Sequence, residues 1–221
     1  MVNDNSLAED ETRPSLLKRV GGQLCLDFTN TIDPRHGEHP HEYLKNYADL
    51  VVWSRYVDIL TENEAQHLLY NAAKHPAIAA IVFQRALTLR ETLYQTFSSI
   101  IKGKQPTEEQ LEILNVTLAE GMARARIFPK GDGFLWTWSE TSHALERILW
   151  PIARSAAELL ISDDVKYIKE CPGDDGCGWL FVDTSRNHRR RWCDMEGCGN
   201  RAKARRYYER TGKRSSATEE R

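Results

Sequence analysis

The stretch CPGDDGCGWLFVDTSRNHRRRWCDMEGCGNR, residues 171–201, decides the fold of the C-terminal part of this chain. Four of the five cysteines lie in it, Cys171 and Cys177 as a C-x5-C pair and Cys193 and Cys198 as a C-x4-C pair fifteen residues later. Zn²⁺ prefers four tetrahedral ligands, and its softness favours thiolates. The spacing therefore predicts one structural Zn²⁺ per chain, held by these four cysteines.

Two other states of the cysteines remain open. Disulfides or redox thiols would need an oxidising compartment, and the polar, acidic N-terminus lacks the features of a signal peptide. Plain buried thiols are the third possibility. A catalytic zinc is disfavoured, because four thiolates close the coordination shell that a catalytic ion keeps open for water.

The residues around the cysteines predict a small module with its own secondary structure. Residues 178–183 read as a strand with residues 165–170 as its partner, and residues 200–208 are good helix formers. This order is typical of a treble-clef or ribbon-like zinc module. Trp179 and Trp192 are predicted to form its core rather than to stack on bases, because so small a module has few other apolar groups.

A basic block overlaps the cysteines. The chain carries a net charge of −2, yet residues 186–214 hold eleven Lys or Arg and three acids, which leaves +8 there and −10 elsewhere. Such a block favours a polyanion as partner: DNA, RNA or an acidic protein surface. The residues predicted to contact nucleic acid are Arg186, Arg189, Arg190, Arg191, Arg201, Lys203, Arg205 and Arg206.

Upstream of the module the pattern is mostly helical. Thr61 and Thr107 each open a capping box, and Pro76 begins a long helix. Residues 23–28 read as a strand that buries Cys25, and residues 126–138 as a β-hairpin to which this strand could add. A last helix is expected over 142–161, with a kink or boundary at Pro151. The predicted fold class is α+β and predominantly helical: a helical domain with a small antiparallel sheet, followed by the zinc module.

The composition suggests the domain organisation and the class of protein. We expect a loose arm at 1–18, a helical regulatory domain at 19–162, a zinc module at 163–212 and a tail at 213–221. No apolar run approaches the ~20 residues of a membrane span, so a cytoplasmic protein without membrane contact is expected. The chain has no phosphate-binding glycine loop, nucleophile elbow, HExxH or zinc-deaminase pattern, and nothing indicates an enzyme. The histidine-containing loop with His36, His39 and His41 is expected to be an exposed loop rather than a metal site.

The residues Cys198-Gly199-Asn200-Arg201 spell the motif CGNR. With Cys177–Phe181, Asp183–Asn187 and Arg191–Cys193 they resemble the bacterial CGNR zinc-finger family. Upstream, residues 24–28, 30–31, 47–50 and 149–160 resemble the ABATE domain that accompanies this finger in stress-induced transcription regulators. The resemblance covers about residues 20 to 210.

This resemblance implies a zinc-dependent, DNA-binding module on a regulatory domain, with Cys171, Cys177, Cys193 and Cys198 as ligands. It also implies that the N-terminal domain senses a small-molecule effector; formation of a homodimer is the alternative role that we consider for this domain. Asp27, Asn30 and Arg35 are the candidates for the mouth of an effector pocket, and hydrogen bonding at a strand end is their alternative role. The competing hypothesis is an interaction protein that docks RNA or an acidic protein.

Overall fold

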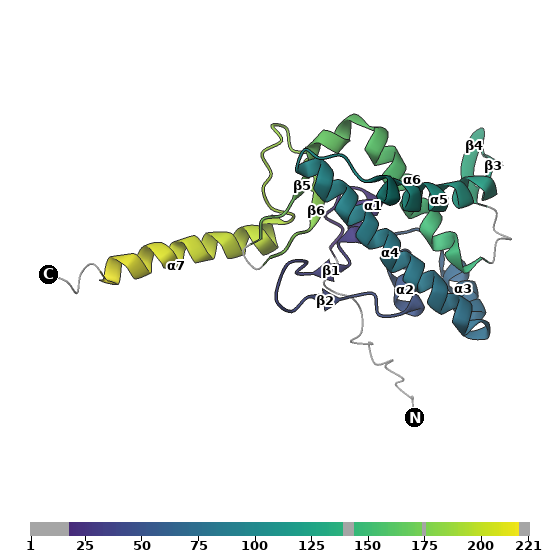
Figure 1. Ribbon diagram of the computed structural model, residues 1–221, viewed down its shortest axis with the longest axis horizontal. Coiled ribbons are helices and arrows are strands. Elements are labelled where there is room, and N and C mark those ends of the chain that lie inside the picture. The colour runs from purple at the N-terminus through teal and green to yellow at the C-terminus, as the bar shows by residue number, and fades with distance from the viewer. Residues whose placement is uncertain (1–17, 139–143, 174–175, 217–221) are drawn as a thin grey trace, which may run out of the picture.

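Local capping signals place the helices of the body. The computed structural model describes residues 18–138, 144–173 and 176–216. Helices α3 (Glu62–Lys74) and α5 (Glu108–Arg124) begin at capping boxes, as predicted. Pro76 starts α4 (Pro76–Ile101), the long helix through the body, and Asn46 caps α2 (Tyr47–Tyr56) by accepting from the amide of Asp49 (Figure 1). The first 17 residues of the expected arm and the last five of the tail lie outside the described residues, as do Ser142 and Asp174-Asp175.

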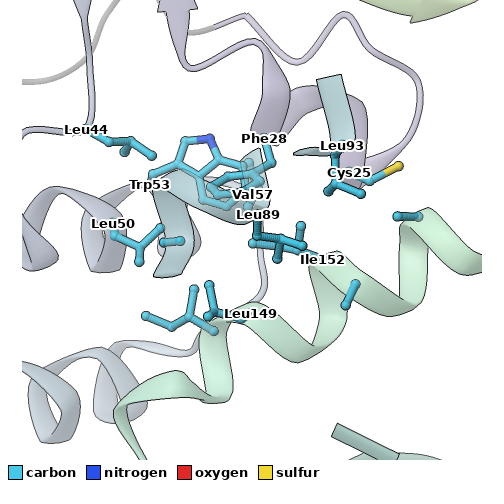
Figure 2. Close-up of a cluster of buried hydrophobic side chains, with 14 of the residues drawn as sticks. Cys25, Phe28, Leu44, Leu50, Trp53, Val57, Leu89, Leu93, Leu149 and Ile152 are labelled. Atoms are coloured by element: carbon cyan, nitrogen blue, oxygen red, sulfur yellow. The ribbon is translucent and has the colours of Figure 1, made fainter. Parts of the chain in front are cut away.

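The hydrophobic core lies where α1 (Leu24–Thr29), α2, α4 and α6 (Leu149–Ile161) meet. Figure 2 shows Phe28 and Trp53 at its centre, with their ring centroids 5.2 Å apart. Leu89 and Leu93 of α4 and Ile152 of α6 close around them, and all are buried. The core thus joins the N-terminal residues to a helix more than a hundred residues later in the chain.

The predicted strand at residues 23–28 is wrong, because this segment is the short helix α1. A short apolar run cannot be assigned to strand or helix from periodicity alone. Here the carboxylate of Asp27 accepts a hydrogen bond from the amide of Gly21 at 2.8 Å, and the amide of Cys25 donates to Ser155 Oγ at 3.1 Å. The second bond satisfies one of the amides that a helix start leaves open, and the first ties the preceding loop to the helix. Cys25 is buried as expected, but on a helix.

The predicted hairpin is present as β3 (Ala125–Lys130) and β4 (Gly133–Trp138). Since residues 24–29 are helical, they add no third strand, and this sheet has two strands among the described residues. Trp138 anchors the base of the hairpin by donating from Nε1 to the carbonyl of Gly121 at 2.9 Å. After the hairpin, a 3-10 turn (Leu145–Ile148) leads into α6, with Pro151 in its first turn, so the expected break falls at a helix boundary.

Two further sheets have two short strands each. The loop after α1 is framed by β1 (Ile32–Asp33) and β2 (His41–Glu42), and the zinc module begins with β5 (Ile168–Glu170) paired to β6 (Leu180–Val182). The strand expected from residue 165 starts only at Ile168, because residues 163–167 form a 3-10 turn capped by Ser162. Along the described ranges, no helix is both long and apolar enough to cross a membrane.

The β5–β6 pair belongs to the same core as the helices. Ile168, Leu180 and Val182 are buried in the cluster that also contains Phe28 and Leu93. The last helix, α7 (Asn200–Ser216), instead extends away from the body, as Figure 1 shows at the yellow end of the chain. The first half of the predicted zinc module is therefore seated in the body, while its second half leads into a projecting helix.

Candidate metal centre and cationic helix

The four cysteines of the C-terminal region come together in one buried cluster. The four Sγ atoms all lie within 4.8 Å of one another, and all four residues are at most 5% exposed: Cys171, Cys177, Cys193 and Cys198. The Sγ atoms of Cys177 and Cys193 are 3.7 Å apart, as are those of Cys193 and Cys198. Four sulfurs about 2.3 Å from a tetrahedral Zn²⁺ would be about 3.8 Å from one another, whereas a disulfide bond is about 2.05 Å long. The cluster thus has the donor chemistry and the dimensions of one structural zinc site.

Backbone geometry brings the first pair together. The amide of Cys171 donates to the carbonyl of Trp179 at 2.8 Å, and the amide of Gly178 donates back to Cys171 at 3.2 Å. Gly173 lies so close to the second cysteine that a Cβ there would be 2.4 Å from Cys177 Cβ. Only glycine fits this turn of the first knuckle, the name used below for residues 171–178.

A second turn carries Cys193 and Cys198. Asp194 caps a π-helical turn (Met195–Gly199) by accepting from the amides of Glu196 and Gly197. Arg201, the second residue of α7, donates from Nη2 to Cys198 Sγ at 3.2 Å. Hydrogen bonds from the neighbouring thiols, Cys171 first, and this guanidinium hold the pKa of Cys198 well below its usual range. We call residues 193–199 the second knuckle.

The cationic loop between the knuckles, residues 184–192, is held by the buried carboxylate of Asp183. This side chain accepts from the ammonium of Lys169 at 2.6 Å, from Ser185 and from the amide of Arg190. Burial works against ionisation, but these contacts hold the pKa of Asp183 well below its usual range. The sequence gives no local sign of this role, because Lys169 approaches Asp183 only through the pairing of β5 with β6.

The structure separates Arg190 from the other loop arginines. Its guanidinium lies 4.4 Å from the ring of Phe181 and donates to the carbonyls of Trp192 and Cys193, so it binds the loop to the second knuckle. Arg186, Arg189 and Arg191 are exposed, with Arg191 beside the ring of Trp192. Trp179 is buried against the cysteines, as expected of a core residue.

Helix α7 presents the remaining predicted cations to solvent. Ala202 is buried at its start, and every side chain from Lys203 to Thr211 is exposed. Lys203, Arg206 and Arg210 recur at steps of three and four residues and so share one face. Arg205 pairs with Glu209 at 3.8 Å. The module therefore displays a cationic helix whose first turn is attached to the cysteine cluster.

The three residues predicted for a pocket mouth lie in different places. Asn30 is buried and holds the first strand after the knuckle, since its amide donates to and accepts from the backbone of Leu180, both at 2.9 Å. Arg35 bonds to Glu91 and to the carbonyl of Thr29, and its guanidinium lies 3.8 Å from the centroid of the Tyr94 ring. Asp27 lines a cleft elsewhere. Asn30 and Arg35 thus contribute to the junction between body and module.

The loop after α1 is hydrogen-bonded to the first knuckle. Nothing in the sequence indicated this contact. The amide of Arg35 donates to Cys177 at 2.9 Å and that of His36 to Gly176 at 2.8 Å. His36 Nε2 also lies 2.9 Å from Glu170 and 2.7 Å from the hydroxyl of Tyr94. His36 is therefore part of this junction. Within the described ranges, the cysteine cluster is the one group of three or more His, Cys, Asp or Glu placed to hold a metal.

Asp27 faces a cleft of about 670 Å³ between the start of α1, the end of α2 and the base of the hairpin. Its walls include Leu24, Val57 and Trp138, and Arg147 reaches it while paired with Glu64 at 2.6 Å. Burial raises the pKa of Asp27 to about 6 from an ordinary value of 3.8, although the amide of Gly21 and the charge of Arg19 oppose this.

This shift makes a prediction about stability against pH. Because the folded state binds the proton of Asp27 more tightly than the unfolded chain, its contribution to the free energy of unfolding falls as pH rises from about 4 to about 6. Asp27→Asn is expected to remove that fall, as measured by urea unfolding at a series of pH values. An equal slope in the variant and the original chain would refute this role of burial.

Comparison with protein-family models gives two matches. A model named ABATE, described as "Putative stress-induced transcription regulator", matches residues 22–163. A model described as "CGNR zinc finger" matches residues 167–211, which include all four clustered cysteines and the beginning of α7. No curated protein matches the chain.

Proposed function

From the membership of this chain in the ABATE family of transcription regulators, we propose that its CGNR zinc finger binds duplex DNA and that α7 is the main contact. The observation that carries the proposal is the exposure of this helix. An α-helix with side chains is about 10–12 Å wide, which fits the major groove of B-DNA at about 12 Å. Seventeen residues at 1.5 Å each make α7 about 25 Å long, enough for several base pairs.

The charge on α7 supports a nucleic-acid partner. Lys203, Arg206 and Arg210 form one cationic row, and Arg205 lies beside it. Tyr207 and Tyr208 are exposed between these cations at 59% and 70%, and their rings meet edge to face. Cations bind phosphates, and exposed aromatic rings make apolar contacts with bases and sugars.

The loop at 184–192 offers a second cationic contact. Arg186, Arg189 and Arg191 project from a loop fixed by Asp183, so they are held near the start of α7 rather than on a free arm. Guanidinium groups bind phosphates through two parallel hydrogen bonds. Contacts to phosphates position a protein on DNA while a helix reads the groove.

The four cysteines would hold the zinc ion in this protein. A thiolate-coordinated Zn²⁺ supplies folding free energy and no open ligand position, so its role is structural. Cys171 and Cys177 lie on the body side of the cluster, and Cys193 and Cys198 lie on the α7 side. The residues around them thereby fix the direction in which α7 leaves the body.

The helical body would supply regulation. Its cleft beside Asp27 has apolar walls and charged side chains, as effector pockets do. Asn30 and Arg35 would contribute to this regulation outside the cleft, because they connect the helices of the body to the first knuckle. We place this activity in the cytoplasm, where a DNA-binding regulator meets its target.

A binding experiment with matched charge variants tests the proposal. Fluorescence anisotropy would follow the full chain on a labelled random duplex DNA pool between 50 and 200 mM salt, the range over which phosphate contacts produce a steep loss of affinity. The triple variant Lys203→Ala/Arg206→Ala/Arg210→Ala is expected to bind about 10- to 100-fold more weakly at low salt. Its salt slope should be smaller by about 3, one for each phosphate contact removed.

The control removes the same charge from the body. Lys45, Lys102 and Lys104 are exposed, and their replacement with alanine should leave affinity within about twofold. Equal binding by the α7 variant and the original chain would refute the proposal. Tighter binding of single-stranded RNA or of an acidic peptide than of duplex DNA would also refute it, in favour of the corresponding partner.

A further inference from the structure

Residues 18–22 contact both the cleft of the helical body and the zinc module, and we call them the linking segment. Arg19 lines the cleft. Its neighbours in the sequence face the module: Lys18 forms an ion pair with Asp194 of the second knuckle, and Val20 packs against the cluster that contains the four cysteines. Adjacent side chains of one short segment therefore touch the body and the module.

The backbone of Gly21 adds a second connection between the cleft and the module. Its amide donates to Asp27 Oδ1 at 2.8 Å, and its carbonyl accepts from the amide of Val182 in β6 at 2.9 Å. A Cβ at Gly21 would lie 2.8 Å from the amide nitrogen of Asp27 and from the Cβ of Leu26, so this close approach needs glycine. A movement of Asp27 therefore shifts the backbone to which β6 is bonded.

The charges around the cleft leave one carboxylate without a cationic partner. Of the lining arginines, Arg19 pairs with Asp58 at 2.8 Å. The other, Arg147, pairs with Glu64 at 2.6 Å. Within the described ranges this leaves Asp27 as the lining charge that forms no ion pair. Its raised pKa reflects the cost of burying the carboxylate, and a cation beside it would offset that cost.

The walls of the cleft fit the apolar part of an organic cation. They include Leu24, Val57 and Pro151. The ring of Trp138 also lines the cleft, and it is held in place because Nε1 donates to the carbonyl of Gly121 at 2.9 Å. Aromatic rings attract cations, and a volume of about 670 Å³ is typical of small-molecule sites. A metal ion does not fit, because the cysteine cluster is the one group of three or more metal-binding side chains that lie close enough together among the described residues.

We propose that this cleft binds a small organic cation, a protonated amine that carries an apolar group, and that the linking segment transmits its binding to the second knuckle. The ammonium group contacts Asp27, and the apolar group lies against Trp138. A ligand in contact with Asp27 and Arg19 restrains the linking segment, and Lys18 and Val20 then restrain the second knuckle. The consequence for regulation rests on the proposed function, because the second knuckle directs α7. Binding and transmission are both measured without DNA.

Calorimetric titration of the full chain tests the ligand class, at about pH 8, where a carboxylate with a pKa of about 6 is ionised. The probes are propylamine, phenethylamine and tryptamine, each compared with the alcohol of the same carbon skeleton. At least one amine is expected to bind at least about tenfold more tightly than its alcohol. Asp27→Asn keeps an oxygen for the amide of Gly21 but removes the charge, and it should weaken that amine at least about tenfold. Asp132→Asn, at an exposed position in the hairpin turn, is the control and should bind it within about twofold of the original chain.

Hydrogen exchange tests the transmission. With the tightest-binding amine of the panel at saturation, the backbone amides of residues 193–199 should exchange at least about fivefold more slowly in the original chain. Lys18→Ala/Val20→Ala removes side-chain contacts of the linking segment with the module. This variant should bind the amine within about threefold of the original chain but lose the change in exchange. Lys45→Ala/Val52→Ala, at exposed positions of the body, is the matched control and should keep that change.

Each result decides one part of the inference. Amines that bind no more tightly than their alcohols, or equally well to the Asp27→Asn variant, overturn the ligand class. An amine that binds without slowing exchange in residues 193–199, or that still slows it in the Lys18→Ala/Val20→Ala variant, overturns the transmission. A chain that binds amines in this way but has no affinity for DNA would refute the proposed function alone. A chain that binds DNA through α7 and binds no amine would refute this inference alone.

Discussion

Cys198→Ser is expected to lower the affinity of the chain for duplex DNA by at least about 100-fold while the helical body stays folded. The reason is the unequal attachment of the two knuckles. The first is bonded to the body through the amides of Arg35 and His36 and through the pairing of β5 with β6. The second is attached chiefly through the cysteine cluster, Arg190 and the ion pair of Lys18 with Asp194. Loss of one metal ligand therefore releases α7 first.

Two measurements check this result. Anisotropy on duplex DNA should show the loss of affinity, and zinc removal by a chelator should reproduce it in the original chain. Hydrogen exchange should show lost protection in residues 193–211 and retained protection in α4. Cys25→Ala is the matched cysteine control, since Cys25 is buried against α6 in the core of the body and is not a member of the four-cysteine cluster, and the DNA affinity of this variant should be unchanged. A Cys198→Ser protein that binds DNA normally would show that the metal does not orient α7.

Asn30→Ala is expected to lower the free energy of unfolding by about 2–5 kcal/mol. The side chain is 1% exposed and makes two hydrogen bonds to Leu180, one to its amide and one to its carbonyl. Alanine leaves both backbone groups buried without that partner, and each unsatisfied group costs about 1–3 kcal/mol.

Urea unfolding of the full chain measures this effect. Asn63→Ala, at an exposed position of α3, is the control and should change the free energy of unfolding by less than about 0.5 kcal/mol. The Asn30 variant should also bind zinc more weakly, because Leu180 follows the first knuckle. A change of under about 1 kcal/mol would mean that water replaces both bonds and that Asn30 does not hold the module in place.

Structural features that depend on a few neighbouring residues were predictable from the sequence. The capping boxes at Thr61 and Thr107, the long helix from Pro76 and the hairpin near residue 130 all depend on local chemistry. The gathering of the four cysteines was also predictable, because two close pairs can meet around one ion. The family resemblance is confirmed by both model matches.

Features that depend on distant partners were not predictable. The run Leu24–Phe28 has the composition of a strand, whereas its helix packs in the shared core and its Cys25 amide donates to Ser155, which lies 130 residues away. Asn30 and Arg35 were expected at a pocket mouth, yet their partners are Leu180, Glu91 and the first knuckle. Arg190 has the same sequence context as Arg189 and Arg191, and only the approach of Phe181 and the Cys193 carbonyl distinguishes it.

The projecting α7 also has a thermodynamic consequence. From Lys203 to Thr211 its exposed side chains gain little from burial, so its helical state depends mostly on intrinsic propensity and on the turn at Cys198 that nucleates it. Contact with DNA would shift this helix–coil equilibrium, and the conformational entropy lost in doing so would oppose binding. Warming would then weaken recognition more than contacts alone imply, and substitutions that touch neither body nor DNA would alter affinity through helix propensity.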